Sequence, residues 1–251
     1  LHPARTRGGR PTHLAWLLGR EGSNHMSDRQ SPSATCYYCG QTYTNRGMYQ
    51  HLRACDARQA AIEEANAQEV PRTRIFHLAI KGDRYHWLHV EAPANASLAN
   101  LDRFLRDIWV ECCGHLSEFT IDDVHYVSSV DYWWNPEDRE MTVELGEVLH
   151  SKLEFSYQYD FGTSTDLGLR VASEREGVLP GDDVIHLMAR NQLPDYRCEV
   201  CGEPATVLCT FCGYVLLCDA CLEEHECGDE GLMPVVNSPR MGMCGYTGDA
   251  W

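Results

Sequence analysis

The sequence predicts an α+β fold: a core of mostly antiparallel sheet with packed helices, and two small zinc-stabilised modules beside it. Three observations lead to this class. Most of the 13 cysteines lie in two clusters, one towards each end of the 251-residue chain. Between them, several short runs alternate apolar and polar residues, which is the period of a half-buried strand. An apolar stripe at helical spacing, from Leu98 to Trp109, supplies a helix to cover the sheet.

The first cluster reads Cys-x2-Cys-x11-His-x3-Cys and falls within residues 35–56. Two thiolates two residues apart can hold a tetrahedral zinc ion from one tight turn, and a His/Cys pair completes the shell. A few apolar side chains lie between the ligands, as in a hairpin-plus-helix finger. The expected ligands are Cys36, Cys39, His51 and Cys55.

The second cluster offers eight ligands within thirty residues, enough for two zinc ions. A disulfide framework is the alternative, but it suits small secreted chains. Repeated Cys-x2-Cys pairs with interposed histidine favour zinc in a reducing cytoplasm. We therefore expect a cytoplasmic protein with about three zinc ions in structural sites. The ligands expected here are Cys198, Cys201, Cys209, Cys212, Cys218, Cys221, His225 and Cys227.

The core elements follow from alternation and turn residues. Strands are expected at 74–80 and 85–90 around a Lys-Gly-Asp turn, followed by a helix that Ser97 caps. Two short strands flank Asp122 and Asp123, and a short helix is expected within 142–150. The clearest strand is 152–161, where Leu153, Phe155, Tyr157, Tyr159 and Phe161 alternate with polar residues, and a further strand follows at 167–171.

These patterns divide the chain into consecutive parts. Residues 1–25 carry four arginines and one acid and precede Met26, so we expect a non-native or leader segment there, with Met26 as the start. The parts that follow are a zinc finger (35–56), a helical linker (57–71), the α+β core (72–176), a linker with a short helix near 184–191 (177–197), and the two-zinc module with its tail (198–251).

The core resembles the plasmid pRiA4b ORF-three-like family, whose members are also labelled insertion-element passenger proteins of the TnpR type. The matching segments are IFHLAIKGDRYHWLHVEAP, SLANLDRFLRDI, ECCGHLSEFTI and, above all, FSYQYDFG followed by TSTDLGLRV. The family's usual Asp, Trp and His after this glycine are replaced by Thr163, Ser164, Thr165 and Asp166. The resemblance implies a compact α+β domain carried on mobile elements, with no established enzymatic activity.

The second cluster resembles B-box-type and HIT-type zinc modules, which usually bind proteins. That resemblance implies interleaved binding, in which the first and third cysteine pairs share one zinc and the second and fourth pairs share the other. Cys227 and Cys244 then compete for the last position. Cys227 requires a helix to end near His225, which Gly228 makes plausible. Cys244 lies on a Gly- and Pro-rich tail that could fold back. We favour Cys227.

Three core residues attract attention as a polar pocket: His115, Tyr159 and Asp160. The structural interpretation is a core histidine and an aspartate that caps the turn after its strand. Catalysis would need convergent partners and a pocket, so we expect no catalytic residues. The vicinal pair Cys112-Cys113 lacks metal-ligand spacing and is interpreted as a buried helix end.

Composition limits the function. The formal charge of -16 is unsuited to wholesale phosphate binding, which needs clustered positive charge. No apolar run reaches the roughly 18 residues of a membrane span. We expect a non-enzymatic adaptor or regulator that binds protein partners. One alternative is a nucleic-acid-binding regulator that uses the first finger, in and just after which Asn45, Arg46, Arg53 and Arg58 lie. The other is a hydrolase or nuclease accessory with its pocket in the core.

Overall fold

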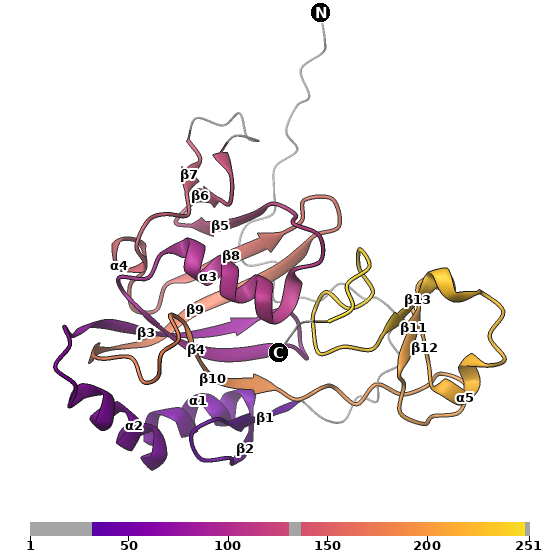
Figure 1. The fold of residues 1–251 in the computed structure, drawn as a ribbon, viewed down its shortest axis with the longest axis horizontal. Helices are drawn as coiled ribbons and strands as arrows, with labels where there is room; N and C mark the ends of the chain where they lie inside the picture. Colours follow the sequence, from indigo (N-terminus) through magenta and orange to yellow (C-terminus); the bar gives the residue numbers. More distant parts are fainter. Residues whose placement is uncertain (1–31, 131–136, 249–251) are drawn as a thin grey trace, which may run out of the picture.

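A computed structural model describes residues 32–130 and 137–248, and the segment 1–25 lies outside this part of the chain. The predicted α+β class is confirmed. Most of the helices lie next to a ten-stranded, mostly antiparallel sheet, and a separate three-stranded sheet lies beside it (Figure 1). Among the described residues, none of the helices has both the length and the apolar character needed to span a bilayer.

The large sheet has the strand order β2-β1-β10-β4-β3-β9-β8-β5-β6-β7, and its neighbours are antiparallel except for β6 and β7. The small sheet has the order β12-β11-β13. The strands are β1 (Ser33–Cys36), β2 (Thr42–Thr44), β3 (Thr73–Lys81), β4 (Trp87–Pro93), β5 (Ser117–Ile121), β6 (Val124–Val127), β7 (Arg139–Glu140), β8 (Glu154–Tyr159), β9 (Thr165–Gly177), β10 (His186–Asn191), β11 (Val207–Cys209), β12 (Val215–Leu217) and β13 (Leu232–Pro234).

The helices are short and several lie close to the cysteines. The elements are α1 (Asn45–Ala54), α2 (Asp56–Asn66), α3 (Leu98–Leu105) with a π-helical turn after it (Arg106–Val110), α4 (Leu145–Val148), α5 (Asp219–Leu222) and a 3-10 turn (Asp229–Gly231). Helix α3 begins as expected at Ser97, whose hydroxyl accepts from the amide of Asn100 while the Asn100 side chain accepts from the Ser97 amide. Its apolar face covers the sheet and joins the main core.

The strand that the sequence predicted most clearly is present as β8. Phe155, Tyr157 and Tyr159 are buried, and the residues between them are more exposed. This strand pairs with β5 on one side and β9 on the other, so its inward face meets α3 in the centre of the core. The tyrosines therefore bring their hydroxyl groups to α3 and the loop after it.

The helix expected near 184–191 is wrong, because this segment forms β10 inside the large sheet, between β1 and β4. The short apolar run Leu187-Met188-Ala189 is buried there. Periodicity cannot separate a buried helix from a buried strand over so few residues. The expected linker 177–197 thus contributes a structural strand.

The first cysteine cluster is joined to the core through the same strand. β1, which ends at Cys36, pairs with β10 in the register Ala34↔Asn191 to Cys36↔Ala189. Side chains of β1 and α1 pack with Trp87 and Met188 in one apolar cluster. The strands of the finger consequently form one edge of the large sheet, and the finger is not a separate module joined by a linker.

A buried ion cluster fastens α2 to the sheet. Glu91 of β4 is 1% exposed and accepts hydrogen bonds from Arg58 of α2 and from Arg175 of β9. Burial alone would raise the pKa of this carboxyl, but the two guanidinium groups outweigh it and hold the pKa below its usual range. The carboxylate therefore contributes stability that is present at neutral pH and lost as the pH falls.

We predict that Glu91→Gln lowers the free energy of unfolding by about 3–5 kcal/mol at pH 7, because it leaves buried arginine charge without a partner. Urea unfolding should show this loss, and the difference from the parent should shrink as the pH falls below about 4. Glu174→Gln is the matched control, since Glu174 lies in an exposed pair with Arg74 and should change stability by less than about 1 kcal/mol. Equal effects of the two substitutions would contradict the prediction.

Candidate metal centres

Four groups of cysteine and histidine side chains come together in the described part of the chain. Within each group the four candidate ligand atoms all lie within 4.8 Å of one another. All thirteen cysteines belong to one of these groups, and all are free thiols. Thiolate and imidazole donors in fours are the sets that hold tetrahedral zinc. Each group could therefore hold one metal ion.

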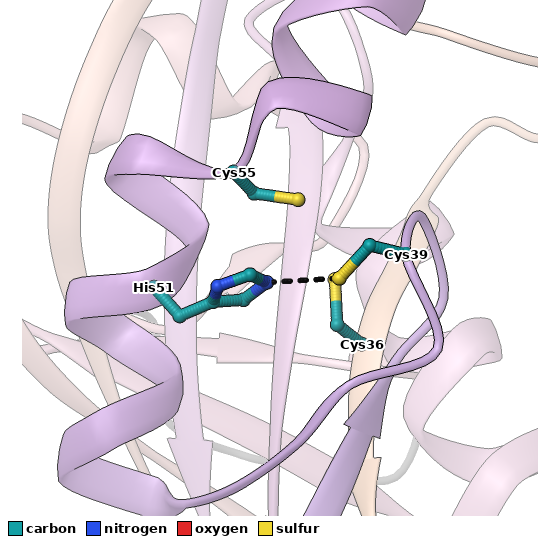
Figure 2. Close-up of side chains that lie close together, drawn as sticks. All are labelled: Cys36, Cys39, His51 and Cys55. Atoms are coloured by element: carbon teal, nitrogen blue, oxygen red, sulfur yellow. Dashed lines mark hydrogen bonds between the residues drawn. The ribbon is translucent and has the colours of Figure 1, made fainter.

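The first group brings together all four residues expected from the sequence: Cys36, Cys39, His51 and Cys55. Figure 2 shows their side chains converging from the strand end, the following turn, helix α1 and the residue after that helix. The Cys39 Sγ and the His51 Nε2 are 3.2 Å apart. The ring of Tyr43 stacks on the His51 ring at 4.3 Å between centroids, which fixes the imidazole plane.

Local backbone geometry explains the turn in this group. Gly40 has a φ of +73° and its amide donates to the carbonyl of Cys36, so the chain reverses tightly around Cys39. The amides of Cys39 and Tyr38 face the Cys36 sulfur. Burial nevertheless raises the pKa of Cys36 to about 11. This thiol stays protonated at neutral pH unless a cation takes the place of its proton.

The C-terminal module contains two groups, and the ligands alternate between them along the chain. Cys198 and Cys201 meet Cys218 and Cys221, with 3.5 Å between the sulfurs of Cys201 and Cys218. The other group lies at the end of β11 and after α5, and its members are Cys209, Cys212, His225 and Cys227. The order of pairs is the interleaved one that the resemblance to B-box-type and HIT-type modules implied.

The second of these groups contains Cys227 and not Cys244. The Cys212 sulfur lies 2.9 Å from the Cys227 sulfur and 3.6 Å from the His225 Nε2. Helix α5 ends at Leu222, and Gly228 then has a φ of +69°, so the chain turns back within reach of the site. The early helix end removes the difficulty that a two-residue spacing has on a helix.

Backbone amides prepare two thiols of this module for a cation. Burial would raise the pKa of Cys198, but amides of Cys201, Cys218 and Val200 outweigh it and lower the pKa to about 6. For Cys209 the opposing groups are the His225 ring and the amides of Cys212 and Phe211, and the pKa falls to about 7. Both thiols are thus readily deprotonated near neutral pH, as metal ligands must be.

The three core residues of the expected polar pocket also lie together. The His115 Nε2 is 3.5 Å from an Asp160 carboxylate oxygen, and the Tyr159 hydroxyl accepts from the His115 amide at 3.2 Å. Asp160 accepts from the Gly162 amide, as a turn-capping aspartate should. Its other oxygen accepts from Arg240 at 2.8 Å, a partner that the sequence did not suggest. Asp160 is buried and both of its oxygens are engaged.

The interpretation of Cys112-Cys113 as a buried helix end is wrong. Cys113 is exposed, and the pair forms the fourth group together with His115 and Cys244. The missed signal was arithmetical: the first two clusters account for ten cysteines, three remain, and a histidine lies two residues after one of them. A vicinal pair lacks a familiar ligand spacing, so its local pattern does not mark it as a metal site.

Comparison with known proteins adds little here. No family model matches the chain, and no curated protein matches it. Among solved structures, a match is the crystal structure of a protein of unknown function from Methanosarcina mazei Go1. It is 20% identical, the alignment covers 47% of this chain and 67% of that one, and the TM-score is 0.37. That likeness assigns neither a fold nor a function to this chain.

The interleaved pairing can be tested by counting metal. We predict that the double variant Cys201→Ser/Cys218→Ser loses about one ion per chain, because both residues hold the same ion. The double variant Cys201→Ser/Cys212→Ser should lose about two, because these residues belong to different groups. Elemental analysis of purified protein gives the counts. Sequential pairing would reverse the two results, so the pair of variants serves as its own control.

Proposed function

We propose that this chain is a non-enzymatic adaptor or regulator that zinc ions hold in shape and that binds protein partners. The three groups expected from the sequence would bind zinc through four protein ligands each. Such closed shells leave no position for a reacting water and are structural. We also propose that the core is related to the plasmid ORF-three-like family and is carried by a mobile element. The FSYQYDFG segment, which spans most of β8 and the turn after it, supports this relationship.

The observation that carries the proposal is that large apolar side chains are exposed on the cysteine turns. Tyr37, Val200 and Phe211 are 56%, 71% and 64% exposed, and each lies between the two cysteines of a Cys-x2-Cys turn. Tyr214, at 51%, follows Cys212 by two residues. A turn held by a metal ion presents its side chain in one conformation, so a partner loses little entropy in binding it. Aromatic anchors of this kind dominate protein interfaces.

A hollow beside the first of these turns fits the same role. Its volume is about 260 Å³, and Tyr37, Tyr38, Ile185 and Leu187 are among its lining residues. An apolar side chain supplied by a partner would fit this space.

Charge favours protein over nucleic acid as the partner. The chain carries a formal charge of -16, and phosphate binding needs a basic surface. Of the residues in and just after the finger that could contact nucleic acid, Arg58 is buried against Glu91, and the Asn45 side chain lies 3.2 Å from the His89 ring. Arg46 and Arg53 stay more accessible, which is a small footprint. The acidic surface suits a basic protein partner and would speed its association.

The hydrolase alternative has less support. A catalytic carboxylate needs a free oxygen and room for substrate. The carboxylate oxygens of Asp160 instead accept hydrogen bonds from Arg240 and from the Gly162 amide. The Tyr159 hydroxyl donates to Glu111 and accepts from nearby amides. These contacts suit a structural role better than proton transfer.

We predict that Val200→Ser and Phe211→Ser each weaken partner binding about 30-fold, equivalent to about 2 kcal/mol for the loss of an anchor. The partner is first captured by the intact chain and identified, and its affinity is then titrated against purified variants. Val70→Ser is the matched control, since Val70 is exposed but distant in sequence from the cysteine turns.

The proposal fails if neither turn variant changes the affinity while metal content stays intact. Salt-dependent retention on nucleic acid that Arg46→Ala and Arg53→Ala abolish would favour the nucleic-acid alternative instead.

A further inference from the structure

The fourth cysteine group joins two parts of the chain that are far apart in sequence. Cys112, Cys113 and His115 follow the π-helical turn after α3, while Cys244 lies on the C-terminal tail, 131 residues beyond Cys113. In Figure 1 this tail, drawn in yellow, runs back from β13 towards α3 and the large sheet. The group is the meeting point of the core and the segment that carries the two-metal module.

The ligand atoms are spaced as a tetrahedral metal ion requires. The Cys113 sulfur is 3.6 Å from the Cys112 sulfur and 3.7 Å from the Cys244 sulfur. Two thiolates on one zinc ion, with bonds of about 2.3 Å, stand about 3.8 Å apart. The His115 Nε2 lies 3.0 Å from Cys113 and 3.2 Å from Cys244, close to the 3.2 Å between Cys39 and His51 in the first group.

A disulfide explains this arrangement less well. Bonded sulfurs are about 2.05 Å apart. The Cys112–Cys113 and Cys113–Cys244 sulfurs are both far beyond that distance. Three thiols and one imidazole nitrogen around a common centre make a Cys3His donor set. Two of the other three groups have the same donor composition.

Polar contacts hold the tail in place just before Cys244. The Arg240 side chain is fully buried and donates to the Asp160 carboxylate, the Thr163 carbonyl and the Thr165 hydroxyl. The Ser238 hydroxyl donates to the Trp109 carbonyl at 2.6 Å. These bonds bring the tail to the end of α3, where the other three ligands lie.

The same arginine also serves the sulfur cluster. Arg240 donates to the Cys112 sulfur at 3.3 Å, and its guanidinium lies 4.7 Å from the Tyr159 ring centroid. Three thiolates around a divalent cation leave one negative charge, which an adjacent guanidinium offsets. The Tyr159 hydroxyl accepts hydrogen bonds from the amides of Cys112 and His115, and these bonds fix the loop that carries three of the candidate ligands.

We infer that Cys112, Cys113, His115 and Cys244 bind one further zinc ion, and that this ion clamps the C-terminal tail to the core. Four protein ligands fill its shell, so the site is structural. The consequence reaches beyond local folding. The tail leads directly from the two-metal module, so the clamp sets where that module sits relative to the large sheet.

Metal counting and hydrogen exchange together test the clamp on the full chain. Cys244→Ala and Cys113→Ala should each lower the zinc content by about one ion per chain, and the double variant should lose no more than either alone. Cys244→Ala should also speed exchange of the tail amides of Met241, Met243 and Tyr246 by about tenfold or more. Those amides donate within the tail in the intact chain.

Two control variants show that the effects belong to this site. Ser238→Ala removes a tail hydrogen bond but no ligand, so zinc content should not change. Cys227→Ser should cost an ion in the module while tail exchange stays slow, which separates loss at this site from general loss of metal.

Unchanged zinc content in Cys244→Ala, or an intact-mass measurement that finds a disulfide among these cysteines, overturns the site. Zinc loss with unaltered tail exchange overturns the clamp.

Discussion

The buried ion pair between Arg240 and Asp160 holds the C-terminal tail against the core sheet, and the position of the fourth cysteine group depends on this contact. Asp160 lies at the end of the central strand β8, in a left-handed conformation with a φ of +62°, and Arg240 reaches it from the C-terminal tail. Both side chains are buried, so breaking the pair would leave an uncompensated charge at a cost of about 3–5 kcal/mol. Because the arginine also contacts Cys112 and the loop after β8, one side chain fastens the tail, the sulfur cluster and the core sheet together.

The tail makes a second connection, to another part of the sheet. Asn237 exchanges hydrogen bonds with Asn191 of β10, and Arg190 donates to the Asn237 carbonyl. β10 in turn pairs with β1, which ends at Cys36 in the first cysteine group. The two terminal cysteine regions, separated by the whole core in sequence, thus meet the same strand. Metal ions bound at these cysteine groups would stabilise contacts between segments as well as the small modules that contain them.

This arrangement gives physical content to the adaptor hypothesis. The chain places its polar core residues in ion pairs and hydrogen bonds, as with Glu91 and Asp160, and exposes large apolar side chains on the cysteine turns. Rigid turns with exposed aromatic or aliphatic side chains, on a strongly acidic protein, are suited to holding a basic partner.

Features that depend on local spacing could be predicted from the order of the residues. Alternation predicted β8, Ser97 predicted the start of α3, and Cys-x2-Cys turns predicted ligand groups whose members do converge. These patterns succeed because two residues on one strand face, or two thiols in one turn, are positioned by a few backbone dihedrals. The twelve ligands of the first three groups could be named in this way.

Other features depend on contacts between segments that are distant in sequence. Residues 187–189 form a strand because their segment hydrogen-bonds to β1 on one side and to β4 on the other. The apolar run alone does not distinguish this strand from a buried helix. The tail folds back over the end of α3, and this brings Arg240 into contact with Asp160. It also brings Cys244 close to Cys112, Cys113 and His115. Contacts across 80 to 131 residues depend on the order of the strands and the path of the tail. Local spacing carries no record of that order, since it is set by which buried faces and charges can be satisfied together.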